Sequence, residues 1–228
     1  MTKVQENLEI VHRHICEACS AAGRKAEEVK LIAVSKTKPA ELVREAYEAG
    51  QRLFGENRPQ ELRDKQPLLP DDTVWHMIGH LQRNKVKYVV GHAAMIHSVD
   101  SIRLAEAISE EAVRKSLTVP VLVEVNMALE ASKFGLRPED TEEFIEAISR
   151  LPGIRVRGLM TIAPYTDDPE TNRPYFRELR NLSIDINSKN IDNVDMCELS
   201  MGMSGDYMTA VEEGATFVRV GTGIFGER

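Results

Sequence analysis

One lysine in this sequence is well placed to do covalent chemistry. Lys36 follows a run rich in Val, Leu and Ile over positions 29–35, and Thr37-Lys38-Pro39 then opens a helical pattern. The run predicts a buried parallel strand that delivers the Lys36 amine to a binding site. Desolvation and nearby positive charge favour a neutral amine, which can condense with an aldehyde as a Schiff base. The alternative is a solvated lysine whose stem lies along an apolar surface.

Two glycine-rich turns predict an anion site. Ser200-Met-Gly-Met-Ser204-Gly205-Asp206 leads into a helical pattern, and Arg219-Val-Gly221-Thr222-Gly223 ends the last apolar run. Glycines let the backbone come close to a ligand, and free N–H groups at a helix start bind anions. The alternative is that the glycines only form tight turns and that Ser204 caps a helix. We expect Ser200, Ser204, Gly221 and Thr222 to contact a phosphate.

An amine opposite an anion site matches the two ends of pyridoxal 5′-phosphate, whose aldehyde would bond to Lys36. Arg219 lies between them in this arrangement and is expected to face the pyridine nitrogen. Because an arginine keeps its proton, that nitrogen would stay unprotonated and the ring would be a weak electron sink. This suits holding a cofactor better than cleaving substrates. The alternative for Arg219 is an ion pair with Glu198 or Glu213.

The elements that must position these residues alternate between strands and helices. Candidate strands fall near residues 30–36, 52–56, 74–79, 95–99, 119–126, 155–162, 197–201 and 217–221. Helix-like segments lie between them, at Ala40–Ala49, Pro59–Lys65, Arg83–Tyr88, Ile102–Lys115, Pro138–Arg150, Thr171–Ser188 and Asp206–Glu212. This order predicts the α/β class and a (β/α)8 TIM barrel, with the third and seventh units short. An open doubly wound sheet is the alternative, but no G-x-G-x-x-G follows the first strand.

Residues 1–24 precede the repeating part and are expected to form an N-terminal helix packed on the barrel, within one domain spanning 1–228. In such a barrel the ligand site forms at the carboxyl ends of the strands. Several positions at predicted strand ends gather at that rim together with both glycine-rich turns. They are Lys36, Gly55-Glu56-Asn57, Gly79-His80 and Asn126. Asn57 is counted among the expected cofactor contacts.

Composition limits the function classes. The chain has 228 residues, 42% of them hydrophobic and 29% charged, and a formal net charge of −7. A negative protein has no overall field that attracts nucleic acid or an anionic membrane. No apolar stretch approaches the roughly 20 residues that span a bilayer, and the N-terminus lacks a signal-peptide core, so we expect a cytoplasmic protein.

Other candidate motifs carry less weight. Cys16, Cys19 and Cys197 are odd in number, which argues against a disulfide framework, and Cys16-Glu-Ala-Cys19 lies in a helical pattern with no preceding strand. His76 and His80 stand four apart in a strand end and turn, so one helical face does not present both to zinc, and no metal site is expected. The basic positions Arg83, Lys85 and Lys87 form a solvated face that could meet an acidic partner.

Several motifs together resemble the pyridoxal phosphate homeostasis protein family. They are Ala33–Pro39, Phe54–Asn57, Trp75–Lys85, Ser132–Gly135, Ser200–Asp206 and Arg219–Gly226. The resemblance runs nearly end to end and implies a barrel like the N-terminal domain of alanine racemase. It implies that Lys36, rather than its neighbour Lys38, is the Schiff-base lysine. It also implies that the protein stores and delivers the cofactor.

The end of the sequence bears on the choice between enzyme and carrier. Racemases with this barrel take an acid/base group from a second domain and a partner subunit, whereas this sequence stops at Arg228, just after the last predicted strand. We therefore expect a binding protein that is a monomer and passes pyridoxal phosphate to apo-enzymes. An amino-acid racemase and a Schiff-base aldolase are the alternatives.

Overall fold

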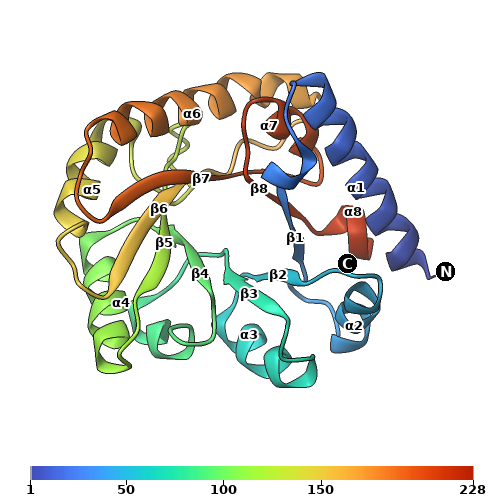
Figure 1. The fold of residues 1–228 in the computed structure, drawn as a ribbon, viewed down its shortest axis with the longest axis horizontal. Helices are drawn as coiled ribbons and strands as arrows, with labels where there is room; N and C mark the ends of the chain where they lie inside the picture. Colours follow the sequence, from blue (N-terminus) through green and yellow to red (C-terminus); the bar gives the residue numbers. More distant parts are fainter. Residues whose placement is uncertain (1, 228) are drawn as a thin grey trace.

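The strands close into a parallel barrel. A computed structural model describes residues 2–227, in which eight strands pair in the order β1 to β8 and β8 returns to β1 (Figure 1). The strands are β1 (Lys30–Val34), β2 (Leu53–Glu56), β3 (Val74–Met77), β4 (Met95–Val99), β5 (Val119–Glu124), β6 (Ile154–Met160), β7 (Val194–Met203) and β8 (Phe217–Val220). The barrel expected from the alternating order is confirmed.

Helices surround the barrel on its outside (Figure 1). The α-helices are α1 (Lys3–Ala21), α2 (Ala40–Glu48), α3 (Pro59–Lys65), α4 (Ile102–Arg114), α5 (Thr141–Ile148), α6 (Arg173–Ser188), α7 (Tyr207–Glu212) and α8 (Thr222–Phe225). Short 3-10 helices are η1 (Ala26–Glu28), η2 (Gln66–Leu68), η3 (Arg83–Tyr88), η4 (Pro138–Asp140) and η5 (Pro169–Asn172). No helix within residues 2–227 combines the length and the apolar character needed to cross a membrane.

The structure corrects several expected boundaries. The segment Arg83–Tyr88 is a 3-10 helix. 3-10 turns also begin the fifth and sixth helical segments, with Pro138 and Pro169 at the first helical position, where no N–H is needed. The seventh strand is not short but is the ten-residue β7. It continues through Ser200 to Met203 because these residues still pair with β8, across a register shift.

The N-terminal helix packs on the last units of the barrel. Thr2 and Gln5 form a capping box that starts α1, and the helix buries Val4, Leu8 and Val11 on one face. The helix contacts α7 and α8 and is tied to them by side-chain hydrogen bonds. It therefore supports the two short helices that follow the glycine-rich turns.

The barrel interior holds both apolar and polar side chains. Ile32, Val34, Met95, Leu122 and Phe217 belong to an inner apolar cluster that is distinct from the layer between strands and helices. Buried polar residues stand among them on β3, β4, β7 and β8: His76, His97, Ser200 and Arg219. Buried polar groups need partners, and these four hydrogen-bond to one another.

Candidate functional site

A cavity of about 480 Å³ opens at the carboxyl ends of the strands. It brings together six of the seven cofactor contacts predicted from the sequence, namely Lys36, Asn57, Ser204, Arg219, Gly221 and Thr222. The seventh, Ser200, is fully buried outside this lining and hydrogen-bonds to Arg219. Ser200 therefore supports a residue of the wall instead of lining the cavity itself.

Several lining residues escaped the sequence analysis. Pro164, Tyr165 and Thr166 follow β6, and Asn172 and Asp206 complete this side of the wall. Applying the strand-end rule to β6 as well as to its neighbours would have found the first three. Asn172 gave no signal, because it lies within a segment that reads as helix.

The loop that carries Lys36 is held in place by a buried polar cluster. Ser35 Oγ donates to Glu56 Oε1 at 2.7 Å, and Lys65 Nζ donates to the Ser35 carbonyl at 2.6 Å. On the other side of Lys36, the Thr37 amide donates to Glu61 Oε2 at 2.7 Å. Thr37 itself has a φ of 63°, an uncommon conformation that these contacts maintain.

Lys65 is the centre of that cluster. Its Nζ lies 2.7 Å from Glu56 Oε1 and 2.9 Å from Glu61 Oε2. Glu56 is fully buried, and this burial raises its pKa even though Lys65 and Ser35 favour the charged form. Removing one partner of a buried ion pair leaves an uncompensated charge, so Lys65 and Glu56 depend on each other.

Lys38, the second amine near the expected site, has a different environment. Its Nζ donates to the carbonyls of Phe225, Gly226 and Glu227 at 3.3, 3.0 and 2.7 Å. Lys38 therefore binds the carbonyl groups at the end of α8, where a positive charge is favourable. Lys36, in contrast, lines the cavity.

The two glycine-rich turns meet through one hydroxyl group. Ser204 Oγ accepts hydrogen bonds from the amides of Gly221 at 3.2 Å and Gly223 at 3.3 Å. The turn after β7 and the turn after β8 thus form one surface, as expected for adjacent strand ends. Within residues 2–227, the amides of Ser204, Gly205 and Thr222 have no acceptor, so this surface presents N–H groups that can bind an anion.

Buried polar contacts fix the turn after β7. Asp206 Oδ1 accepts from the Met203 amide at 2.6 Å, and Asn172 Nδ2 donates to Asp206 Oδ2 at 2.8 Å. Gly202 is required here, because its φ is 88° and a Cβ would lie 2.5 Å from the Cβ of Ala210. The turn is therefore held tightly against α7.

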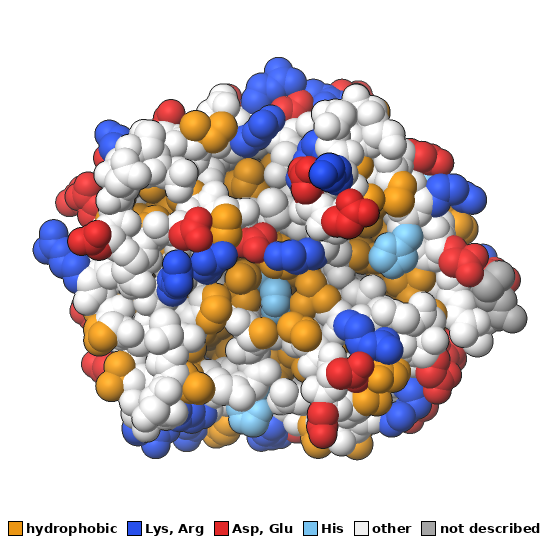
Figure 2. Space-filling model, viewed as in Figure 1, with side chains coloured by type: hydrophobic (Ala, Val, Ile, Leu, Met, Phe, Trp, Pro, Cys, Tyr) orange, Lys and Arg blue, Asp and Glu red, His pale blue; other side chains and the backbone are white. Residues whose placement is uncertain are grey.

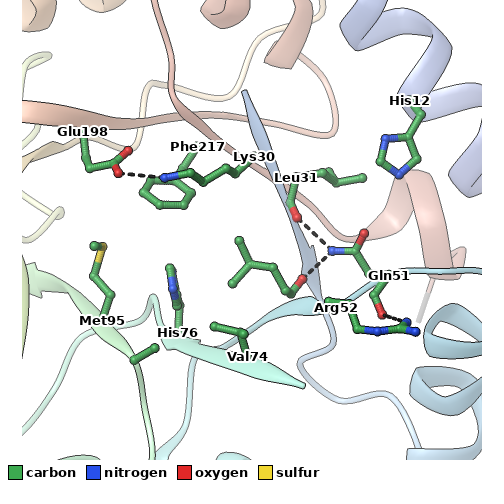
Figure 3. Close-up of a pocket in the computed structure, with 12 residues that line it drawn as sticks. His12, Lys30, Leu31, Gln51, Arg52, Val74, His76, Met95, Glu198 and Phe217 are labelled. Atoms are coloured by element: carbon green, nitrogen blue, oxygen red, sulfur yellow. Dashed lines mark hydrogen bonds and ion pairs between the residues drawn. The ribbon is translucent and has the colours of Figure 1, made fainter. Parts of the chain in front are cut away.

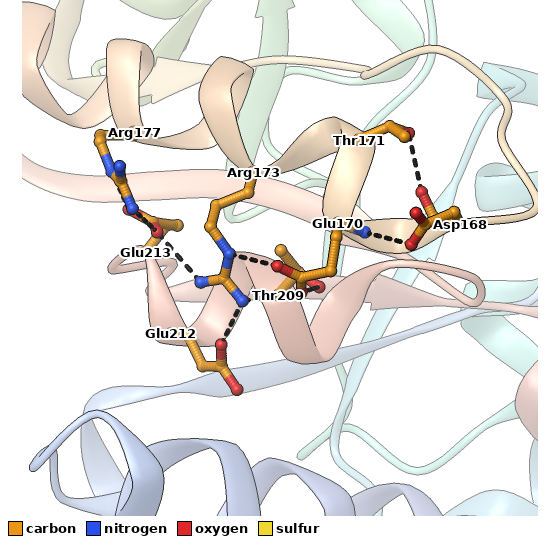
Figure 4. Close-up of polar contacts among 8 residues, drawn as sticks. All are labelled: Asp168, Glu170, Thr171, Arg173, Arg177, Thr209, Glu212 and Glu213. Atoms are coloured by element: carbon orange, nitrogen blue, oxygen red, sulfur yellow. Dashed lines mark hydrogen bonds and ion pairs between the residues drawn. The ribbon is translucent and has the colours of Figure 1, made fainter.

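An ion-pair network outside the cavity ties α6 to α7 (Figure 4). Arg173 pairs with Glu170 at 2.7 Å, Glu212 at 2.6 Å and Glu213 at 3.0 Å, and Arg177 pairs with Glu213 at 2.7 Å. These hydrogen bonds, that from Arg177 above all, hold the pKa of Glu213 below its usual value. The network joins the start of α6, next to Asn172, to the helix that follows the glycine-rich turn after β7.

Arg219 is a buried cation on the cavity wall. Its Nη1 donates to Ser200 Oγ at 2.6 Å and its Nη2 to the Thr161 carbonyl at 2.8 Å. Burial lowers its pKa to about 10, against the opposing effect of Glu124 and Asp206, so Arg219 remains protonated at neutral pH. The alternative pairing with Glu198 or Glu213 is wrong, because those carboxylates pair with Lys30 and with the α6 arginines.

Glu124 is a buried carboxyl group that the sequence analysis did not single out. It ends β5, and its Oε2 is a buried atom without a hydrogen-bond partner in the described structure. Burial, reinforced by the nearby Asp100, raises the pKa of Glu124 to about 7, whereas Arg219 acts in the opposite direction. The charge of Glu124 therefore changes in the neutral pH range.

The remaining sequence candidates lie away from the cavity. Cys16 is exposed and Cys19 is buried on α1, and both are free thiols. His76 points into the barrel, whereas His80 stacks on Phe134 at the rim with ring centres 3.8 Å apart. Residues 2–227 hold no group of three or more His, Cys, Asp or Glu side chains arranged for a metal ion.

The cavity combines an amine, a protonated arginine and backbone N–H donors. Such a site suits a phosphorylated ligand with a carbonyl group that an amine can attack. No single residue indicates this chemistry by itself. It follows from the presence of Lys36, Arg219, Ser204 and Thr222 in the lining of one cavity.

Comparison with known proteins gives consistent matches. The family model for "Alanine racemase, N-terminal domain" matches residues 7–228. The chain is 47% identical to the pyridoxal phosphate homeostasis protein of Aquifex aeolicus, over 98% of this chain and 97% of that protein. It is 44% identical to the pyridoxal phosphate homeostasis protein of Pseudomonas aeruginosa, over 100% of this chain and 97% of that protein.

A solved structure shares the fold and much of the sequence. PipY of Synechococcus elongatus, with PLP bound, superimposes with a TM-score of 0.80 at 39% identity. The match covers 93% of this chain and all of that one.

Proposed function

This chain belongs to the alanine racemase N-terminal domain family and, within it, to the pyridoxal phosphate homeostasis proteins, and we propose that it binds, stores and delivers pyridoxal 5′-phosphate. The observation that carries the proposal is one cavity lined by Lys36, Arg219 and the joined glycine-rich turns. A relative of 39% identity that was solved with PLP bound supports it.

The side chains fit the three functional parts of this cofactor. When bound, pyridoxal phosphate supplies an aldehyde that condenses reversibly with an amine. We assign Lys36 to that linkage, because its loop is fixed by Glu56 and Lys65 while the amine of Lys38 binds carbonyl groups elsewhere. Asn57 lines the same cavity and would help to position the cofactor.

The phosphate would bind at the turns after β7 and β8. The Ser204 hydroxyl group and the amides of Ser204, Gly205 and Thr222 would contact it there, and Gly221 joins the two turns through its hydrogen bond to Ser204. Asn172 and Asp206 hold the turn after β7 in shape. Hydrogen bonds from fixed amides to a charged phosphate are stronger than bonds between neutral groups. Ser200 acts indirectly, by orienting Arg219.

Arg219 would face the ring nitrogen and keep its own proton there. A guanidinium with a pKa of about 10 does not give up a proton at neutral pH. The ring nitrogen would stay unprotonated, and the ring would be a poor sink for electrons. This arrangement favours retention of the cofactor over turnover of amino acids.

The proposed role is therefore that of a carrier acting without a turnover reaction of its own. Its partners would be pyridoxal phosphate and apo-enzymes that accept it, in the cytoplasm, with residues 1–228 working as one domain and one monomer. The cavity opens at the barrel rim, which gives the cofactor a route out.

The test of this proposal compares delivery with turnover. Protein loaded with the cofactor is mixed with an apo-enzyme that requires pyridoxal phosphate and, separately, with L-amino acids in deuterated water. We expect activation of the apo-enzyme without incorporation of deuterium at Cα. Repeated deuterium exchange or formation of the other enantiomer, lost in Lys36→Ala, would instead identify an enzyme.

A further inference from the structure

A second cavity, of about 540 Å³, lies at the opposite end of the barrel from Lys36. The first residues of several strands form its wall: Lys30 of β1, Val74 of β3, Met95 of β4 and Phe217 of β8. Figure 2 shows apolar side chains together with basic, acidic and histidine side chains around the hollow in the middle of this face. Figure 3 shows how the lining side chains converge. We call it the lower cavity.

His76 is a buried polar residue of the lower cavity, as are Gln51 and Glu198. His76 is only 5% exposed and still lines the wall. Its Nδ1 lies 2.9 Å from Nε2 of His97, and Nδ1 of His97 lies 2.9 Å from Ser200 Oγ, which also accepts a hydrogen bond from Arg219. A chain of four side chains thus crosses the barrel from the lower cavity to Arg219, which lines the cavity that contains Lys36. We call that cavity the upper cavity.

The direction of this chain follows from counting protons. Burial keeps both histidines neutral: it lowers the pKa of His76 to about 3 and that of His97 well below its usual value. Ser200 Oγ accepts a hydrogen bond from Arg219, and the hydroxyl group has one proton to donate. The acceptor for this proton is Nδ1 of His97. His97 then carries its proton on Nε2 and donates to His76 Nδ1, which leaves the proton of His76 on Nε2.

The Nε2–H of His76 is consequently a donor without an acceptor in the described structure. The network assigns this tautomer, because the opposite direction would leave the Ser200 proton without an acceptor. His76 lines the lower cavity, which is open to water, so this N–H is available to a bound molecule. A ligand that enters the lower cavity with an oxygen acceptor would satisfy it.

A second donor stands beside it. Lys30 Nζ donates to Glu198 Oε1 at 2.8 Å and lies 4.7 Å from the centre of the Phe217 ring. Thr216 Oγ1 donates to Glu198 Oε2 at 2.6 Å, so both oxygens of this carboxylate already accept a hydrogen bond. An ammonium group has three N–H donors, and Lys30 therefore retains donors for a ligand.

We propose that the lower cavity binds a small monocarboxylate with a flat apolar body. Its carboxylate accepts hydrogen bonds from His76 Nε2 and Lys30 Nζ, while its body packs against Val74, Met95 and Phe217. A carboxylate is chosen over a neutral group because the two polar groups assigned to it, His76 Nε2 and Lys30 Nζ, are donors and Lys30 is a cation, while the partner of Lys30, Glu198, is also held by Thr216. The site does not depend on the cofactor function proposed above.

The probe is benzoate, with benzamide as its uncharged counterpart, titrated calorimetrically into the full chain loaded with pyridoxal phosphate. Loading blocks the anion-binding turns of the upper cavity, so any remaining binding of benzoate must occur elsewhere. We expect saturable binding that weakens about tenfold or more in His76→Phe and in Lys30→Met, because each variant removes a charge-assisted hydrogen bond. His92→Asn, at an exposed histidine outside this cavity, should bind benzoate like the wild type.

Nitrogen-15 spectra of the histidine rings in wild-type protein give a measurement that needs no variant. Without the probe, His76 should show a protonated Nε2, and benzoate should shift this signal and that of His97 behind it. Absence of saturable binding, equal affinity in His76→Phe, or a proton on Nδ1 of His76 would each overturn the proposal. Each of these results leaves the binding of pyridoxal phosphate, measured separately, unaffected.

Discussion

Lys36 and Lys38 stand two positions apart on the loop after β1, yet their amines have different surroundings. Lys36 lines the upper cavity, whereas Lys38 donates to three carbonyl groups at the end of α8. The turn at Thr37, with its φ of 63°, separates the two side chains. The position of the Lys36 amine therefore depends on the contacts that hold this loop as much as on the strand before it.

We expect Lys65→Met to destabilise the protein and weaken cofactor binding. The change leaves Glu56 as a buried carboxylate without its cation, at a cost of about 3–5 kcal/mol in the free energy of unfolding. Urea unfolding measures this cost. Lys3→Met removes an exposed pair and should cost less than about 1 kcal/mol.

The double variant Lys65→Met, Glu56→Gln provides the internal check. It removes the stranded charge, so it should be more stable than Lys65→Met alone. Equal urea midpoints for the wild type and Lys65→Met would show that the Glu56 cluster does not hold the Lys36 loop.

Ser204→Ala should weaken binding of pyridoxal phosphate by about tenfold, because the hydroxyl group that joins the two turns is lost. Binding of pyridoxal, which lacks the phosphate, should be weak in the wild type and change little in the variant. Ser132→Ala, at an exposed position on the loop after β5, is the matched control. A similar loss for both ligands would place the phosphate elsewhere.

Glu124 should make stability depend on pH. Its pKa is raised to about 7 in the folded protein, from about 4.5 in an unfolded chain, so the folded state binds the extra proton. This contribution is fully present below pH 4.5 and is lost as the pH rises through about 7. At about 1.4 kcal/mol for each pKa unit, the loss amounts to roughly 3 kcal/mol.

Glu124→Gln mimics the protonated side chain and should therefore be more stable than the wild type at pH 8 but not at pH 4.5. Urea unfolding across this range measures the difference between the two proteins, in which the other titrating groups cancel. A constant difference from pH 4.5 to pH 8 would mean that Glu124 titrates normally.

Much of the barrel could be predicted from the sequence, because buried parallel strands are continuous apolar runs and the helices between them are amphipathic. The strand ends were less predictable. β1 stops at Val34, before the lysine, whereas β7 continues through the polar and glycine residues 200–203. Pairing with a neighbouring strand determines where β1 and β7 end. Such pairing cannot be inferred from the local amino-acid composition.

The lining of the cavity was predictable where residue types and glycine-rich turns stood at strand ends, as with Lys36, Arg219 and the turns after β7 and β8. Ser200 was predicted to contact the phosphate, but the structure places it against Arg219 and His97. The positioning roles of Lys65, Asn172 and Asp206 depend on contacts between distant segments. No local pattern in the sequence contains that information.

The most direct test of the account maps the covalent linkage. The protein is loaded with pyridoxal phosphate and reduced with borohydride, and its peptides are analysed by mass spectrometry. We predict that the label lies on Lys36, is absent in Lys36→Ala while the variant keeps its fold by circular dichroism, and is retained in Lys38→Ala. A label found mainly on Lys38 or another lysine, or retained in full by Lys36→Ala, would contradict the assignment of this cavity as the cofactor site.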